Sequence, residues 1–398
     1  MTSAGAVARC VGDARRFADE FWTRRPLHRP GSDPGGFDDL LALADVDHVV
    51  ATMSLRLPAF RLVKDGKTLP ASASAKSART GSQTVTGMAD PTKIYREFER
   101  GATIVLQGLH RYWLPLARFC RDLELGLGHP TQVNAYITPP GSRGLAVHSD
   151  GHDVFVLQVF GTKAWQVFER EDGAGEGRPL VDVEVQPGDC LYIPKGFPHA
   201  ARAQERACGH LTVGILSPTW RRALDEAVSL AAEEPEFAEP LPLRFAQDRD
   251  ALRRAVEDRL QAFARWVEKA DADEIADRLS RRFLTHRQPL LAGHLQQLLA
   301  LPSLGDDSVV ARRAGAMLVL ERSAEGEGDS EGDGGELVLY LGDRELRMPG
   351  WVEPAMRAVG EAERFAVADL SPHLDRESRL VLVRRLIREG LLEIVGVE

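Results

Sequence analysis

The stretch that decides the fold lies between Thr131 and Ser217, in the segments TQVNAYITPPGSRG (131–144), DVFVLQVFGTKAWQVFER (153–170), VDVEVQPGDCLYIPKGFPHAARA (181–203) and HLTVGILS (210–217). These short runs of β-branched and aromatic residues are separated by glycine and proline, which is typical of strands joined by tight turns. Gly161-Thr162 and Pro187-Gly188-Asp189 predict two of the chain reversals. Strands this short and this closely spaced predict a double-sheet jelly roll whose β core spans about 131–218.

Helical patterns flank this β core. Residues 13–22 (DARRFADEFW) predict a short helix, which the prolines and glycine of RRPLHRPG must end, and residues 64–90 predict a loop or exposed hairpin. After the core, residues 221–301 return to helix. The pattern is clearest where apolar residues recur at three- and four-residue steps, at Leu252, Val256, Leu260, Phe263 and Val267.

Residues 302–398 predict a winged helix, because strand-like runs are followed by a helix, a second helix and a final strand. In the second helix, DRESRLVLVRRLIRE, Asp375 is the expected N-cap and Gly390 the expected C-terminal stop. Between two of the strands, the acidic stretch SAEGEGDSEGDGG (323–335) has nothing to bury and predicts a disordered loop. We therefore expect an α+β protein with a domain at 1–220 that contains the β core, a helical domain at 221–301 and a winged helix at 302–398.

Length, net charge and cysteine content indicate a multidomain protein and argue against several classes. At 398 residues the chain is too long for one ordinary core, and its net charge of −9 argues against a broad nucleic-acid-binding surface. The N-terminus lacks the apolar segment of a signal peptide and no run is long enough to cross a bilayer, so we expect a cytoplasmic protein. Its four cysteines are too scattered for a disulfide framework or a structural zinc site, and they read as reduced thiols: Cys10, Cys120, Cys190 and Cys208.

Three residues have the composition of an iron site. His148 and Asp150 are separated by one residue, and on an extended strand both side chains would project from the same face. His199 follows a second strand, directly after GDCLYIPKGFP. Two imidazoles and one carboxylate on one side of an octahedral ion are the ligands that suit non-haem Fe(II), with positions left open for a co-substrate and oxygen.

A second His-x-Asp pair, His373-Leu374-Asp375, shows that this spacing alone is weak. It lies at a predicted helix start, where side chains two residues apart diverge and Asp375 already serves as the cap. We interpret this second pair as structural.

Lys163 opens the strand that follows the Gly161-Thr162 reversal, and we expect that strand to be the antiparallel neighbour of the one leaving the iron motif. An ammonium group inside an apolar barrel needs an anionic partner, which a dicarboxylate co-substrate supplies. The alternative is that Lys163 faces solvent at the hairpin. Asn134 and Tyr136, two residues apart on one strand, either hydrogen-bond the same ligand or are ordinary strand residues.

Two further histidines and four arginines have ordinary explanations. We expect His210 to be a core histidine satisfied by hydrogen bonds, and His152 is left out of the site because it shares the face of His148 only if the chain does not bulge. In the predicted winged helix, acidic residues interrupt the basic ones, which favours packing or protein contact over DNA binding: Arg379, Arg384, Arg385 and Arg388.

Several of these segments resemble the JmjC-type ribosomal oxygenases, also called the cupin-4 family. The resemblance rests on QVNAYITPPGSRGLAVHSDGHDVFVLQVFGTKAWQVF (132–168), GDCLYIPKGFPHAA (188–201) and HLTVGI (210–215). Upstream, FWTRRPLHRPG (21–31) and GATIVLQGLH (101–110) resemble the family's aromatic-x-x-x-Pro-Leu opening and its Gly-Ala-Thr strand. The resemblance spans most of residues 13–220, and family members also carry a helical dimerisation region and a C-terminal winged helix.

The resemblance implies an Fe(II)- and 2-oxoglutarate-dependent oxygenase. His148, Asp150 and His199 would bind iron, Lys163 would pair with the distal carboxylate of 2-oxoglutarate, and Tyr136 and Asn134 would line the co-substrate pocket. O2 would be the second co-substrate, and a homodimer would hydroxylate a protein side chain, with a ribosomal protein as one candidate. A small peptide or natural product as substrate, and a non-catalytic metal-binding scaffold, remain as alternatives.

Overall fold

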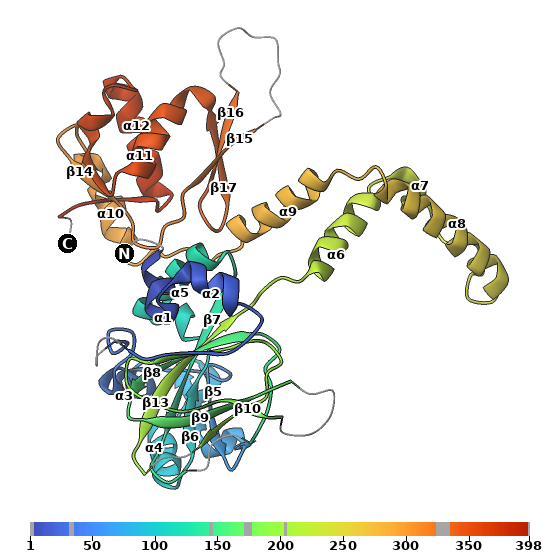
Figure 1. Ribbon diagram of the computed structural model, residues 1–398. Coiled ribbons are helices and arrows are strands. Elements are labelled where there is room, and N and C mark those ends of the chain that lie inside the picture. Colours follow the sequence, from blue (N-terminus) through green and yellow to red (C-terminus); the bar gives the residue numbers. More distant parts are fainter. Residues whose placement is uncertain are drawn as a thin grey trace. The chain divides into compact units, whose positions relative to one another are not determined.

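The computed structural model describes residues 4–31, 36–142, 146–170, 177–202, 205–323 and 335–396. The acidic segment predicted to be disordered falls mostly at 324–334, outside these ranges. The chain divides into two compact units, Met1–Ser217 and Pro218–Glu398 (Figure 1).

Two antiparallel sheets form the centre of the first unit (Figure 1). In spatial order, the larger sheet contains β1 (Leu27–Arg29), β11 (Cys190–Ile193), β8 (Asp153–Phe160), β13 (Cys208–Ile215), β7 (Thr131–Thr138), β6 (Thr103–Leu106), β2 (Phe60–Lys64) and β3 (Lys67–Thr68). The smaller sheet contains β10 (Pro179–Val185), β9 (Lys163–Phe168) and β12 (His199–Arg202). A separate hairpin of β4 (Ala75–Thr80) and β5 (Gln83–Ala89) falls where the sequence predicts a loop or exposed hairpin. The predicted α+β class and jelly-roll core are confirmed.

Alternation along the central strands separates two cores. Val133, Leu157 and Leu211 belong to the core that the larger sheet shares with the N-terminal helices. These helices are α1 (Ala4–Val11), α2 (Ala14–Glu20), α3 (Leu43–Thr52), α4 (Pro91–Glu99) and α5 (Leu114–Leu127). On the opposite face of the larger sheet, Val154 and Val156 pack with residues of the smaller sheet in a second core. Side chains on that inner face therefore point into the space between the sheets.

The predicted pairing of the strand that carries Lys163 is wrong. β9 pairs with β10 and β12, whereas β8 pairs with β11 and β13, so the Gly161-Thr162 reversal carries the chain from one sheet to the other. Gly161 makes this crossing possible, because its φ is +61° and a Cβ there would lie 2.3 Å from the carbonyl oxygen of Ala207.

Helices and two small sheets make up the second unit. Its helices are α6 (Trp220–Ala231), α7 (Pro235–Ala238), α8 (Arg249–Val267), α9 (Ala272–Thr285), α10 (His294–Ala300), α11 (Glu353–Glu361) and α12 (Arg376–Arg388). One sheet contains β18 (Arg364–Ala366), β14 (Val309–Arg312) and β19 (Leu392–Ile394), and the other β15 (Val319–Ser323), β16 (Glu336–Tyr340) and β17 (Glu345–Pro349). Buried side chains such as Val310, Met356 and Leu386 share one core there.

Two local predictions for the last helix hold. Asp375 caps α12, since its Oδ1 accepts the N–H of Ser378 at 2.9 Å, and Gly390 follows the helix with φ +79°. The apolar stripe predicted along α8 is not buried in a core, because Leu260 is 62% exposed and Val256 is 44% exposed. Among the described residues, no helix combines the length and the apolar character that crossing a membrane requires.

The turn at Gly161 generates a stability prediction with a matched control. Gly81 has the same φ of +61° but no neighbouring atom within 4 Å of an added Cβ. Gly81→Ala should lower the free energy of unfolding by about 1 kcal/mol, the cost of a left-handed alanine. Gly161→Ala should lower it by roughly 3 kcal/mol, because the backbone at Ala207 must also move. Urea denaturation of the full chain measures both, and equal losses would contradict the steric role of Gly161.

Candidate functional site

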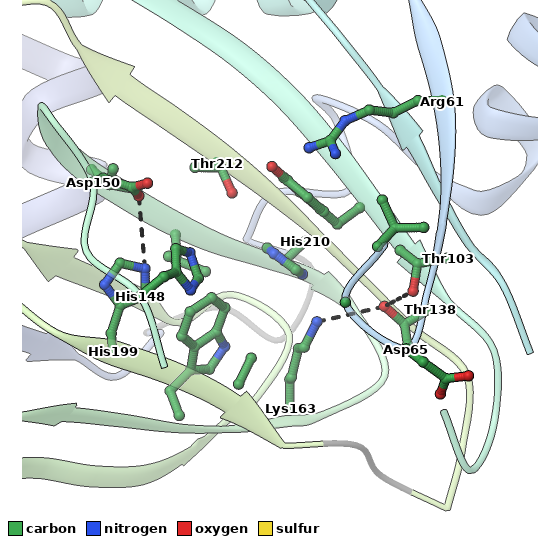
Figure 2. A pocket seen from close by; sticks show the side chains of 17 residues that line it. Arg61, Asp65, Thr103, Thr138, His148, Asp150, Lys163, His199, His210 and Thr212 are labelled. Carbon is green, nitrogen blue, oxygen red and sulfur yellow. Dashed lines mark hydrogen bonds and ion pairs between the residues drawn. The ribbon is translucent and has the colours of Figure 1, made fainter. Parts of the chain in front are cut away.

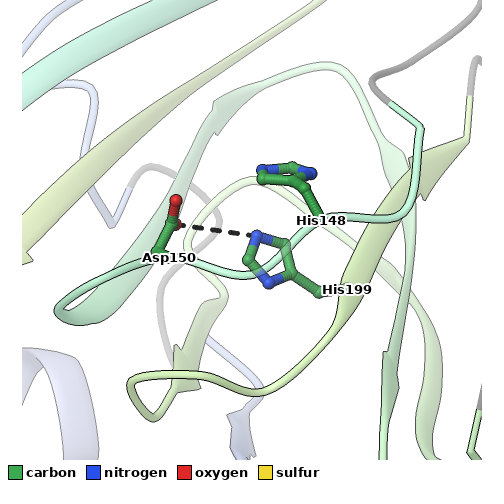
Figure 3. Close-up of side chains that lie close together, drawn as sticks. All are labelled: His148, Asp150 and His199. Atoms are coloured by element: carbon green, nitrogen blue, oxygen red, sulfur yellow. Dashed lines mark ion pairs between the residues drawn. The ribbon is translucent and has the colours of Figure 1, made fainter. Parts of the chain in front are cut away.

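Three side chains meet at one end of the space between the two sheets (Figure 3). His148, Asp150 and His199 each offer one ligand atom, and these atoms all lie within 4.8 Å of one another. The Nε2 of His199 is 3.7 Å from the Oδ2 of Asp150, and the two imidazole centroids are 4.4 Å apart. In the described part of the chain this is the only such group of three or more metal-binding side chains. The second His-x-Asp pair, His373 and Asp375, takes no part in it, in agreement with its interpretation as structural.

Backbone hydrogen bonds bring the two histidines together. The N–H of His148 donates to the carbonyl oxygen of His199 at 3.1 Å, and the N–H of His199 donates to the carbonyl oxygen of His148 at 2.8 Å. A further hydrogen bond, from the N–H of Gly196 to the carbonyl oxygen of Asp150 at 3.0 Å, fixes the backbone position of Asp150. The prediction that His148 and Asp150 lie on an extended strand is wrong. Residues 148–150 precede β8, and His148 forms only this isolated bridge.

Each imidazole is oriented through its other nitrogen. The Nδ1 of His148 donates to the carbonyl oxygen of Ala146 at 2.9 Å, and the Nδ1 of His199 donates to that of Phe197 at 3.0 Å. This arrangement fixes the tautomer that leaves both Nε2 lone pairs available to a metal. Burial also lowers the pKa of His199, which favours the neutral, metal-binding form.

A pocket extends from these three residues between the sheets (Figure 2). Arg61 of β2, Tyr136 and Thr138 of β7, and Lys163 and Trp165 of β9 are among its lining residues. Three strands that are distant in the sequence thus contribute polar groups to one cavity. A donor set of two imidazoles and a carboxylate at one end fits a ferrous ion with positions left for ligands.

Lys163 supplies a buried positive charge to the pocket. Its side chain is 5% exposed, and its Nζ donates to the Oγ1 of Thr138 at 3.5 Å. Burial lowers the pKa of this amine, and in the described ranges no carboxylate is among the groups that shift it. The alternative of a solvent-facing lysine is therefore wrong, and the pocket favours an anionic ligand next to Lys163.

Asn134 and His210 differ from what the sequence predicts, whereas Tyr136 does not. Tyr136 lines the pocket, and burial raises its pKa. Asn134 does not line it; its Oδ1 accepts the N–H of Gly108 at 3.0 Å. His210 does line the pocket, and its buried Nδ1 has no protein partner, so the prediction of a core histidine satisfied by hydrogen bonds is wrong.

Further lining residues went unpredicted. Thr138 and Trp165 each share a strand face with a predicted site residue, so alternation along β7 and β9 could have indicated them. Thr212 shares its face with His210, which the sequence analysis placed in the core. Arg61 carried no such signal, because it reaches the pocket from a strand far away in the sequence. Its guanidinium is held by Gln107 Oε1 at 2.8 Å and Thr68 Oγ1 at 3.2 Å.

Comparison with known proteins agrees with this geometry. Residues 112–223 match the JmjC domain family. Ribosomal oxygenase 1 of Gallus gallus is 28% identical over 298 residues, which cover 67% of this chain and 48% of that protein. The bifunctional lysine-specific demethylase and histidyl-hydroxylase NO66 of Drosophila persimilis is 28% identical over 239 residues, or 55% of this chain and 32% of that protein.

The chain is similar to the JmjC ribosomal oxygenases. It spans about half the length of the first of these relatives. Among solved structures of the family's fold, the ribosomal oxygenase YcfD of Escherichia coli superposes with a TM-score of 0.54 at 19% identity, covering 97% of this chain and 99% of that one. A YcfD structure in complex with cobalt and 2-oxoglutarate has the same TM-score, 18% identity and coverage of 96% and 98%.

The clustering of ligand atoms generates a metal-binding prediction. Asp150→Ala should weaken Co(II) binding by at least about tenfold, because the only carboxylate of the set is lost. Asp375→Ala is the matched control, since it removes the aspartate of the second His-x-Asp pair. It should cost about 1 kcal/mol of stability through the lost cap and leave Co(II) binding unchanged. Absorption titration with Co(II) measures both, and equal affinities would contradict the assignment.

Proposed function

We propose that this protein is an Fe(II)- and 2-oxoglutarate-dependent oxygenase that hydroxylates a protein side chain. One observation carries the proposal: a cluster of two imidazoles and one carboxylate stands at one end of a pocket that also holds the buried, carboxylate-free amine of Lys163. A metal-chelating diacid satisfies both features at once. A non-catalytic metal-binding scaffold would explain the cluster of ligands but not the buried amine. A small-molecule substrate is the other alternative.

Each side chain has a distinct role in the proposal. His148, Asp150 and His199 hold the ferrous ion, which when bound supplies the oxygen chemistry. Lys163 pairs with the distal carboxylate of 2-oxoglutarate and so sets the direction in which the diacid lies. The apolar walls, among them Val154, Val156 and Trp165, exclude water from the reacting centre. Tyr136 borders the same space from β7.

A protein substrate, with a ribosomal protein as the first candidate, is supported by the names of the relatives. Some of those relatives are described both as demethylases and as hydroxylases. Arg61 favours hydroxylation here, because a guanidinium in the pocket lining repels a protonated methyl-lysine. The exposed Asp65 at the hairpin tip also lines the pocket and offsets part of this charge.

The experiment that tests the function uses the anaerobic protein. Fe(II) plus 2-oxoglutarate should produce a visible charge-transfer band in the native protein, and His148→Ala should abolish it because one ligand is missing. On admission of air, the native protein should convert 2-oxoglutarate to succinate and CO2. Absence of the band in the native protein would contradict the proposal and favour the scaffold.

The class of substrate requires a separate readout. Ribosomal proteins from cells with and without the gene should differ by one added oxygen atom on a single residue, as seen by peptide mass spectrometry. If the charge-transfer band forms but no protein differs, a small peptide or natural product becomes the favoured substrate.

We also propose that α6, α7 and α8 mediate homodimerisation. Apolar side chains on this segment are exposed, including Trp220 at 87%, Leu224 at 66% and Leu260 at 62%. Leu260 also lines a hollow together with Val228, Leu241 and Phe263. An exposed apolar surface of this kind is typical of an interaction site, and the family resemblance names a second copy as its occupant.

The dimer prediction is tested by light scattering of the full chain. The native protein should have twice the mass of one chain, and Leu260→Glu should shift it toward the monomer because a charge then enters the interface. Arg253→Glu, on the same helix but paired with Glu257 at 2.7 Å on its exposed face, is the control for a surface charge change. A monomeric native protein would contradict the proposal.

The remaining assignments extend this proposal. We assign residues 221–301 to a dimerisation domain and 302–398 to a winged helix that serves packing or protein contact. Three of its arginines already have partners, with Arg379 bound to Asp306 at 2.9 Å, Arg384 to the carbonyl oxygen of Leu304 at 3.2 Å and Arg385 to Glu389 at 2.7 Å. A cytoplasmic location belongs to the same proposal.

A further inference from the structure

A strongly basic segment interrupts an otherwise acidic chain. Residues 53–89 contain six lysines and arginines and a single acidic residue, Asp65, so the segment carries +5 whereas the whole chain carries −9. The negative charge of the whole chain therefore does not exclude a local contact with a polyanion here. The six basic residues are Arg56, Arg61, Lys64, Lys67, Lys76 and Arg79.

Strand pairing brings several of these charges together. Lys64 is opposite Lys67 in the hairpin of β2 and β3, and β3 is an edge strand of the larger sheet. Arg56 and Lys76 both pair with Met88 of β5, one on each side of it. Since neighbouring strands are about 4.8 Å apart, the Cα atoms of Arg56 and Lys76 lie roughly 10 Å from each other.

These cations have no carboxylate partners in the described part of the chain. Arg56 donates to the carbonyl oxygen of Thr86 at 2.9 Å, and Arg61 donates to the Oε1 of Gln107 at 2.8 Å, both neutral groups. Across the described ranges, the side chains of Lys67, Lys76 and Arg79 make neither ion pairs nor hydrogen bonds, and all three are exposed. The segment therefore presents unneutralised positive charge to solvent.

The rest of this surface has the polar character of a nucleic-acid contact. Within residues 53–89 no large apolar side chain is exposed, whereas the centre of a protein interface needs apolar anchors. Hydroxyl and amide side chains contact phosphate and sugar groups of nucleic acids, as lysine and arginine do. Exposed residues of this kind in the segment are Thr68, Ser72, Ser77, Ser82, Gln83 and Thr84.

We propose that residues 53–89 form an RNA-binding surface. Lysines and arginines of the two hairpins contact phosphates, and the hydroxyl side chains contact phosphates or ribose 2′-hydroxyl groups. The choice of RNA over DNA rests on the proposed function, in which a ribosomal protein is the first candidate substrate. Proteins that bind RNA are themselves cationic, so this surface repels such a substrate alone and attracts it when RNA accompanies it.

The same segment borders the candidate active site. Arg61, Asp65 and Gly66 line the pocket, the first two of which are labelled in Figure 2. The hairpin of Lys64 and Lys67 encloses Asp65 and Gly66 in its turn. RNA bound along this hairpin thus holds an attached protein chain close to the pocket.

Fluorescence anisotropy of a labelled single-stranded RNA of about 20 nucleotides tests the surface, with the full chain at about 50 mM salt. The native protein should bind, and its affinity should fall as salt increases. The triple variant Lys67→Ala, Lys76→Ala, Arg79→Ala should raise the Kd by about 10-fold or more. It should also reduce the slope of log affinity against log salt by about 2, because three phosphate contacts are lost.

The matched control is the triple variant Arg15→Ala, Arg111→Ala, Arg118→Ala. It removes the same charge from exposed positions of the same unit outside residues 53–89, and it should bind RNA as the native protein does. The inference is overturned if the native protein does not bind the RNA, or if the two triple variants have equal affinities.

Competition identifies the class of polyanion. DNA of the same sequence and poly-glutamate with the same number of charges should each displace the labelled RNA less effectively than unlabelled RNA, because neither offers a 2′-hydroxyl group. Equal competition by either would overturn the assignment to RNA. None of these measurements needs iron or 2-oxoglutarate, so a failure of RNA binding is distinguishable from a missing charge-transfer band.

Discussion

The site depends on one short antiparallel bridge. Two backbone hydrogen bonds between His148 and His199, at 3.1 and 2.8 Å, join the loop before β8 to the first residue of β12. The bridge holds two imidazoles at one place although 51 positions separate them in the sequence, and Asp150 follows within the same loop. Because Nδ1 of each ring is bound to a backbone carbonyl oxygen, the bridge sets the direction of the lone pairs as well as their position.

The second constraint is that the pocket is built from both sheets. His210 and Tyr136 face inward from the larger sheet, while Lys163 and Trp165 face inward from the smaller one. The crossing at Gly161 makes this possible, because it carries the chain from β8 of the larger sheet to β9 of the smaller one. A buried amine between two packed sheets is costly unless an anion accompanies it, so the architecture favours a charged ligand.

The sequence predicts the jelly roll, the three clustered side chains and the buried lysine, because each depends on local pattern or residue chemistry. The sequence does not predict the features that depend on pairing between strands distant in the chain. Alternation places Lys163 on an inner face but cannot say which sheet carries it, and the spacing of His148 and Asp150 suggests a strand where the chain forms a single bridge. Arg61 lines the pocket because β2 pairs with β6, and Asn134 accepts a hydrogen bond from the N–H of Gly108. Neither contact has a signature in the surrounding residues.

The most direct measurement is a crystal structure of the protein grown without oxygen in the presence of Co(II) and 2-oxoglutarate. We expect an anomalous-scattering peak about 2 Å from ligand atoms of His148, Asp150 and His199, with the diacid bound to the metal and its distal carboxylate against the Nζ of Lys163. Metal bound elsewhere, or a diacid whose far end lies away from Lys163, would contradict the central claim that these two sheets together form one metal and co-substrate site.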